Sequence, residues 1–151
     1  MNVPGVPNLH RVSQNVYRSA QPTAEGMKNL QAMGIKTVVN LRHFHSDRDL
    51  IGDLPMKSVN YPTLTWDPDP KNVKALLHLV EDPSQGPILI HCQHGADRTG
   101  SMCAIYRVAE QHWTPDEAMR EMTSGGFGYH PVWKNLPGWT RKQMVSYHPG
   151  S

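Results

Sequence analysis

A thiol and a guanidinium with five residues between them stand in the segment His91-Cys92-Gln93-His94-Gly95-Ala96-Asp97-Arg98-Thr99-Gly100. The apolar run 88–90 precedes this segment, and a helix is expected to follow it. A tight turn between a strand and a helix can present a nucleophile and a phosphate clamp side by side. The pattern therefore predicts a hydrolase of phosphate esters.

A phosphate monoester carries two negative charges, so the loop must offer donors before a nucleophile can approach. Successive amides at the positive end of the following helix can surround the three non-bridging oxygens. Gly95 permits the backbone angles that such a curl needs, and Arg98 can hold two oxygens through its planar fork. The predicted substrate-binding residues are Gln93, His94, Gly95, Ala96, Asp97 and Arg98.

The same electrostatic field acts on the sulfur of Cys92. Beside a cationic arginine and a helix amino end, a cysteine is expected to be a thiolate at neutral pH. Cys92 can then attack phosphorus directly, and water hydrolyses the cysteinyl-phosphate that results. Cys92 and Arg98 are thus the predicted catalytic residues. Thr99 is expected to donate to the departing sulfur, and His91 to orient the loop through its ring nitrogens.

Composition limits the possible function classes. The chain has 151 residues and a formal net charge of +2, without the dense Lys/Arg stripes typical of nucleic-acid binding. We expect residues 1–151 to form a single domain with no nucleic-acid partner. No stretch approaches the length of a membrane span. As the chain stands the cytoplasm is expected, or the periplasm if an N-terminal export signal has been removed.

Strands are predicted to alternate with helices along the chain. Predicted strands cover residues 12–18, 35–41, 57–61 and 87–91; predicted helices begin after Thr23, after Asp69, at Arg98 and after Thr114, with a last one inside 132–147. The segment 43–53 is ambiguous, with one or two helical turns. Such alternation indicates an α/β fold whose mainly parallel central sheet is flanked by helices, with ligands at the carboxyl ends of the strands.

The loop resembles the signature His-Cys-x5-Arg-Ser/Thr of the cysteine-dependent protein tyrosine phosphatases. Together with Tyr17-Arg18-Ser19-Ala20-Gln21-Pro22 and Ile35-Lys36-Thr37-Val38-Val39-Asn40-Leu41-Arg42, it makes the chain similar to bacterial dual-specificity phosphatases over roughly residues 7–139. The resemblance implies the phosphatase fold and a phosphorylated protein or peptide as partner. Phosphotyrosine is the favoured substrate, with phosphoserine and phosphothreonine as further candidates.

The family takes a proton for the leaving group from an aspartate upstream of the signature. Asp67 in Trp66-Asp67-Pro68-Asp69 is our preferred general acid. Asp69 is the alternative acid, although it also has a capping role at the helix that Pro70 begins. Asp97, Asp47 or no protein acid at all stay open. Trp66 either shields the loop from water or packs in the core.

Other residues have two interpretations each. Arg42 matches a family position at which an arginine can organise the acid loop, but Arg42 and Arg18 can equally form structural ion pairs. Tyr129 or His130, in a glycine-rich stretch, can reach the cleft or simply pack where a helix stops.

The histidines and the second cysteine do not indicate a metal site or a cofactor. His43 and His45 do not belong to a complete zinc ligand set, so we expect neither a metal nor a cofactor. Cys103 is expected to pack as a small apolar residue inside the helix that follows the signature, and not to pair with an oxidised Cys92.

Three alternatives to a protein phosphatase remain. The first is a phosphoinositide or inositol phosphate phosphatase, which is disfavoured because Asp97 brings a negative charge into the loop and no lysine joins Arg98 there. The second is a catalytically slow module that binds phosphoproteins. The third is a sulfur transferase, whose family has a shorter spacing between cysteine and arginine. We expect the protein to be a monomer.

Overall fold

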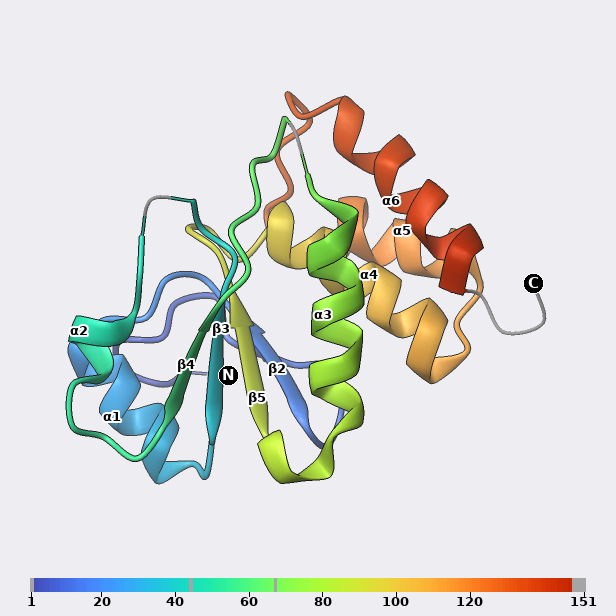
Figure 1. Cartoon of the computed structure of the whole chain (residues 1–151). Coiled ribbons are helices and arrows are strands. Elements are labelled where there is room, and N and C mark those ends of the chain that lie inside the picture. The colour runs from blue at the N-terminus through green and yellow to red at the C-terminus, as the bar shows by residue number, and fades with distance from the viewer. Residues whose placement is uncertain (1, 44, 67, 148–151) are drawn as a thin grey trace.

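A five-stranded sheet runs through the middle of the molecule (Figure 1). In the computed structural model, which describes residues 2–43, 45–66 and 68–147, the strand order is β1-β2-β5-β3-β4. The strands are β1 (His10–Arg11), β2 (Val16–Ser19), β3 (Thr37–Asn40), β4 (Lys57–Asn60) and β5 (Ile88–His91). β2, β5, β3 and β4 are parallel to one another, and β1 pairs antiparallel with β2 at the edge. The predicted α/β fold with a mainly parallel sheet is confirmed.

Helices cover both faces of the sheet (Figure 1). They are α1 (Ala24–Ala32), α2 (Arg48–Ile51), α3 (Pro70–Glu81), the 3-10 turn η1 (Pro83–Gln85), α4 (Arg98–Gln111), α5 (Pro115–Ser124) and α6 (Asn135–Tyr147). α1 and α2 lie on one face, and α3, α4, α5 and α6 lie on the other. Among the described residues, no helix combines the length and the apolar character that crossing a membrane requires.

Alternation along the buried strands divides the core into two layers. Val38 of β3 and Leu89 of β5 pack with Leu30 of α1 on one face of the sheet. Their neighbours Val39 and Ile90 belong to the larger cluster on the other face, under α3 and α4. Successive side chains of a strand point to opposite faces, so a strand buried on both faces is apolar throughout. This explains why β5 reads as a continuous apolar run.

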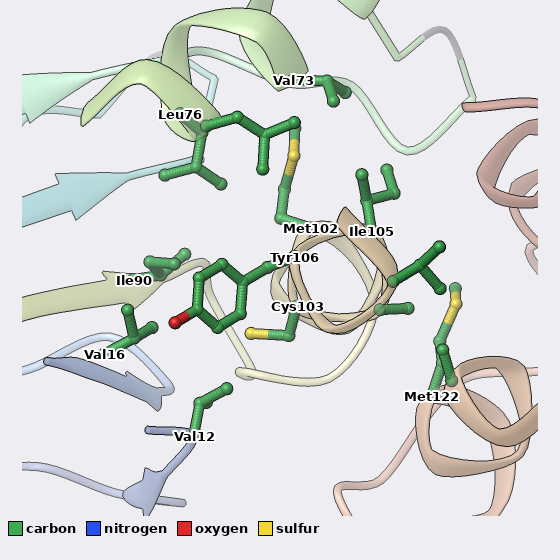
Figure 2. Close-up of a cluster of buried hydrophobic side chains, with 14 of the residues drawn as sticks. Val12, Val16, Val73, Leu76, Ile90, Met102, Cys103, Ile105, Tyr106 and Met122 are labelled. Atoms are coloured by element: carbon green, nitrogen blue, oxygen red, sulfur yellow. The ribbon is translucent and has the colours of Figure 1, made fainter. Parts of the chain in front are cut away.

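α4 lies at the centre of the larger layer, as Figure 2 shows. Figure 2 places its Met102, Cys103, Ile105 and Tyr106 among Val12, Val16 and Ile90 of the sheet side, Val73 and Leu76 of α3, and Met122 of α5. The sequence predicts that Met102, Ile105 and Ala109 point inward from this helix. Met102 and Ile105 are 1% exposed, and Ala109 is partly buried against the same cluster. Because α4 is packed on several sides, its amino end is held firmly at the end of β5.

Capping residues set the helix boundaries that the sequence predicted. The Thr23 hydroxyl accepts from the Gly26 amide at 3.1 Å, and the Asp69 carboxylate accepts from the Lys71 amide at 2.9 Å. Thr114 and Glu117 form the predicted capping box of α5. Each bond satisfies an amide that the first helical turn leaves without an intrahelical acceptor.

Two local predictions were wrong. The strand predicted at 12–18 forms only from Val16 onward, as β2. The polar stretch around Ser13 instead turns the chain between β1 and β2, where the Val12 and Ser13 amides both donate to the Val16 carbonyl. The three-residue spacing of Met27, Leu30 and Met33 predicts that all three lie on the apolar face of the helix after Thr23, but Met33 is the C-cap of α1 and is 38% exposed. The ambiguous segment 43–53 contains the one short helix α2.

Candidate active site

The signature loop begins where the central strand β5 ends. From His91 the chain runs through residues 92–97 into α4, and the side chain of Cys92 is buried at the start of this loop. Gly95 has φ +74°, and a Cβ there would lie 2.6 Å from both the Ala20 nitrogen and the Ser19 carbonyl carbon. Because those are backbone atoms at the end of β2, the close approach requires glycine at this position.

The loop's carbonyl groups are turned into the protein. Four successive carbonyls, those of residues 92–95, each accept a hydrogen bond. The donors are His91 Nδ1 to Cys92 at 3.1 Å, the Gln21 amide to Gln93 at 3.1 Å, Asn8 Nδ2 to His94 at 3.1 Å and an Arg18 Nη to Gly95 at 2.9 Å. In a trans peptide the C=O and the next N–H point in opposite directions. The amides of residues 93–96 are therefore directed away from these supports.

Among the described residues these amides have no acceptor. Within the described ranges, we find no hydrogen bond from the backbone nitrogens of residues 93–99 to a protein acceptor. The last of them belong to the first turn of α4, where the helix dipole adds partial positive charge. A run of free amides around one point is the arrangement that binds a tetrahedral anion.

Asp97 stands at the N-cap of α4 but does not cap it. Its carboxylate instead accepts from the His130 amide at 2.8 Å and contacts His130 Nδ1 at 2.7 Å. A capping carboxylate would occupy the amides at the helix start. Asp97 leaves them free, and it ties the stretch before α6 to the loop. Its negative charge is thereby directed toward His130.

Among the polar atoms that are buried without a partner in the described residues are Nε of Arg98 and the hydroxyl of Thr99, together with Nε and one Nη of Arg18. One Nη of Arg98 donates to the Thr63 carbonyl at 3.2 Å, which holds the guanidinium near the loop. Buried polar atoms without a partner are rare in folded proteins and are often found at functional sites. The groups of Arg98 and Thr99 fit the roles predicted for them, holding an anion and donating to a sulfur.

A cleft of about 430 Å³ opens over the loop. Its lining is His43, Leu64, Thr65, Trp66, Gln93, His94, Asp97, Arg98, His130, Val132 and Trp133. Four of the six predicted substrate-binding residues are in this lining, and the other two, Gly95 and Ala96, belong to the same loop.

One side of the cleft has an apolar rim formed by Trp66, Val132 and Trp133. The rings of Trp66 and Trp133 lie 6.1 Å apart and are tilted by 30°. Trp66 is 64% exposed and Val132 is 72% exposed, so Trp66 is not a core residue. Large apolar side chains exposed together at a cleft commonly mark a binding surface. No pattern in the sequence indicated that Val132 or Trp133 lines a cleft.

The general acid stays a prediction. Asp67 lies outside the described residues, although its neighbour Trp66 lines the cleft. Asp69 caps α3 and lines a separate shallow hollow beside the cleft. Asp97 is engaged with His130, and Asp47 is buried against His91. Each described carboxylate that the sequence offered as an acid thus has a contact elsewhere.

Arg18 and Arg42 make contacts other than those predicted. Arg18 is 1% exposed, donates to the Gly95 carbonyl and stacks on the ring of Phe127, with 3.7 Å between the guanidinium carbon and the ring centroid. Arg42 donates to the side-chain oxygen of Gln21 at 3.1 Å. Within the described part of the chain neither arginine has a carboxylate at ion-pair distance. Arg18 thus holds the phosphate-binding loop on its buried side, through the Gly95 carbonyl.

Of the two residues predicted either to reach the cleft or to pack at a helix end, one lines the cleft and the other packs on the core. His130 lines the cleft, whereas the hydroxyl of Tyr129 donates to the Trp133 carbonyl at 2.7 Å and its ring packs on the core. Burial raises the pKa of Cys103, which is fully buried within α4. Within the residues that the structure describes, including His43 and His45, no group of His, Cys, Asp and Glu is arranged to hold a metal ion.

The family described as "DSP-PTPase phosphatase fused to NAD+ Kinase" matches residues 7–130. The chain belongs to this dual-specificity phosphatase family. The family resemblance read from the sequence is therefore confirmed. Among the solved structures similar to this family member is that of TpbA from P. aeruginosa, with a TM-score of 0.81 and 31% identity, covering 97% of this chain and 94% of that one.

Curated relatives of this phosphatase-family chain extend beyond it. The dual specificity protein phosphatase TpbA of Pseudomonas aeruginosa (strain UCBPP-PA14) is 39% identical over 122 residues, which are 80% of this chain and 56% of that protein. The chain thus spans little more than half of that relative's length. A cysteine-to-serine variant of TpbA has been solved in complex with pTyr, with a TM-score of 0.74 and 31% identity, covering 100% and 93%. The inositol diphosphatase DSP5 of Arabidopsis thaliana is 26% identical over 126 residues, 76% of this chain and 60% of its own.

Proposed function

We propose that this chain hydrolyses phosphate monoesters on proteins, with phosphotyrosine as the favoured group, by a metal-independent route through a cysteinyl-phosphate intermediate. The observation that carries the proposal is the loop around Cys92. The carbonyls of residues 92–95 accept hydrogen bonds from the protein interior. The loop's amides have no acceptor among the described residues, and Arg98 lies beside them. This arrangement fits a dianionic phosphoryl group above a sulfur nucleophile.

The reaction has two steps. In the first, the thiolate of Cys92 forms a bond to phosphorus while the bond to the ester oxygen breaks, and a general acid, for which we propose Asp67, gives that oxygen a proton. In the second, water attacks phosphorus and the sulfur leaves as a thiolate, which the Thr99 hydroxyl stabilises by donating a hydrogen bond. Inorganic phosphate is released. Arg98 and the amides hold the phosphoryl oxygens in both steps.

The apolar rim supports a preference for phosphotyrosine. A tyrosyl ring leaving the loop would pass beside Trp66 and Trp133, where ring contacts contribute about 0.5–1.5 kcal/mol beyond area burial. Phosphoserine has no ring to make these contacts. The pTyr complex of TpbA, a relative with 31% identity, supports the same preference.

An inositol phosphate is the second candidate, because the relative DSP5 is named as an inositol diphosphatase. The cleft fits such a polyanion less well. Arg98 is the one lysine or arginine among its described lining residues, and Asp97 adds a negative charge. Several phosphates would require several cations around them.

Steady-state kinetics on three substrates test the proposal. We expect kcat/KM to be highest for a phosphotyrosine peptide, lower for the matched phosphoserine peptide and lowest for an inositol polyphosphate. Trp133→Ala should reduce the preference for phosphotyrosine by about 3- to 10-fold, as expected for the loss of one aromatic contact. Val145→Ala, which removes an exposed apolar side chain of α6 that does not line the cleft, is the matched control.

The outcomes separate the function classes. Faster turnover of the inositol polyphosphate would replace the protein substrate by the second candidate. Slow phosphate release that Cys92→Ser leaves unchanged would favour a phosphoprotein-binding module. Sulfide release from thiosulfate would indicate sulfur transfer.

A further inference from the structure

Asp47 is a buried carboxylate that the proposed reaction does not use. It stands at the N-cap position of α2, where an aspartate ordinarily binds the first free amides, yet its side chain makes no capping bond. Its side chain is 0% exposed and is turned inward, against Nε2 of His91. A buried carboxylate without partners would destabilise the fold by several kcal/mol. The groups that contact Asp47 therefore explain why it can be buried.

The contacts around Asp47 place an oxygen atom at each ring nitrogen of His91. His91 Nδ1 faces the Cys92 carbonyl at 3.1 Å, and a carbonyl can only accept. His91 Nε2 faces the carboxylate of Asp47, whose other oxygen receives Gln21 Nε2 at 2.8 Å and lies 3.3 Å from His45 Nε2. Both ring nitrogens of His91 thus face an oxygen atom, which is the arrangement in which two acceptors hold an imidazolium.

The ionisation of Asp47 follows from the same contacts. Burial alone would raise the pKa of Asp47, but the hydrogen bond and charge of His91 outweigh it, with further hydrogen bonds from Gln21 and His45. The net result is a pKa below the ordinary value for aspartate. Arg42, the nearest arginine of this network, reaches Asp47 through the side chain of Gln21.

Asp47 also holds two of the loop's four supports. One is His91, which binds the Cys92 carbonyl. The other is Gln21, whose side chain binds Asp47 while its backbone amide binds the Gln93 carbonyl at 3.1 Å. A single carboxylate thereby fixes the two residues that orient the first two peptides of the loop, those on either side of Gln93.

We propose that Asp47 is a positioning residue for the phosphatase reaction: it orients His91 and Gln21 beneath the loop and keeps His91 as an imidazolium next to Cys92. The inference rests on the proposed function. The imidazolium adds a positive charge one residue before the nucleophile, in addition to the charge that Arg98 supplies. It favours the thiolate before the reaction and again when the sulfur leaves.

The test compares Asp47→Asn, which keeps the shape and removes the charge, with Asp49→Asn, which removes an exposed carboxylate from the same short helix. An opposite charge a few ångströms away changes an ionisation equilibrium by at least about tenfold. We therefore expect Asp47→Asn to slow iodoacetamide alkylation of Cys92 in mildly acidic buffer about tenfold and to lower kcat similarly. KM should stay within about threefold. Asp49→Asn should match the wild type in all three.

A double-mutant cycle distinguishes positioning from simple structural damage. If Asp47 acts through His91, the loss in kcat for Asp47→Asn and His91→Asn together is smaller than the two single losses combined. Additive losses would overturn the proposal, as would an Asp47→Asn alkylation profile equal to the wild type.

A measurement on the unmodified protein covers the case in which Asp47→Asn does not fold. Nitrogen NMR should find both ring nitrogens of His91 protonated at neutral pH, and a neutral ring would overturn the proposal. The NMR and alkylation readouts need no turnover. Absence of phosphatase activity would therefore refute the proposed function while these two readouts still decide the role of Asp47.

Discussion

Replacing Gly95 by alanine tests how closely β2 and the phosphate-binding loop are fitted. At φ +74° an L-residue costs about 1–2 kcal/mol. The new Cβ would lie 2.6 Å from two backbone atoms of residues 19 and 20, about 0.8 Å inside the shortest ordinary contact of 3.4 Å. Moving the loop by that amount breaks the Arg18 bond to the Gly95 carbonyl, a charged hydrogen bond of about 1.5–3 kcal/mol. The expected loss of stability is about 3–5 kcal/mol.

Catalysis should suffer more than stability alone implies. A displacement near 1 Å in a catalytic group costs about 100-fold in rate. We therefore expect kcat on an aryl phosphate to fall about 100-fold, at a temperature where the variant is still folded. Urea unfolding followed by circular dichroism gives the stability, and release of para-nitrophenol gives the rate.

Gly34→Ala is the matched control, because Gly34 also has a positive φ of +96° but has nothing within 4 Å of its added Cβ. It should lose about 1–2 kcal/mol and retain its activity. Should the two variants unfold alike and hydrolyse the ester at the wild-type rate, the close fit inferred for the loop would be refuted.

Three further predictions concern charge. Burial and the neighbouring Glu81 raise the pKa of Glu110 to about 7 from 4.5; the folded state then holds a proton that the unfolded state has released, so stability falls as pH rises through this window. Glu110→Gln should therefore raise the melting temperature near pH 8 and leave it nearly unchanged near pH 4. Arg98→Lys loses the planar fork, and kcat should fall about 100-fold or more on para-nitrophenyl phosphate. Iodoacetamide at neutral pH should label Cys92 before Cys103, as read by mass spectrometry, and inorganic phosphate should slow that labelling.

Patterns local in sequence predicted most of the fold. The apolar runs of β3 and β5 indicated buried strands, and the capping residues Thr23, Asp69 and Thr114 marked three helix starts because a cap acts within three residues of itself. The hairpin of β1 and β2 was missed because two-residue β1 is too short to show a period.

The site was predictable where it is continuous in the chain and not where it is assembled by the fold. The loop from Cys92 to Arg98 is one segment, so residue types and spacing were enough to propose it. Asn8 reaches the His94 carbonyl from 86 positions away, a contact that no local pattern encodes. Asp47 appeared in the sequence as a remote candidate acid because burial and its partner His91 are tertiary features.

Co-crystallisation with orthovanadate tests the central claim most directly, because vanadate mimics the phosphoryl group in its transition state. The account predicts a vanadium atom bonded to the sulfur of Cys92. Its equatorial oxygens should accept hydrogen bonds from the amides of residues 93–98 and from the guanidinium of Arg98. Vanadate bound elsewhere, or a loop whose carbonyls have turned toward the cleft, would contradict it.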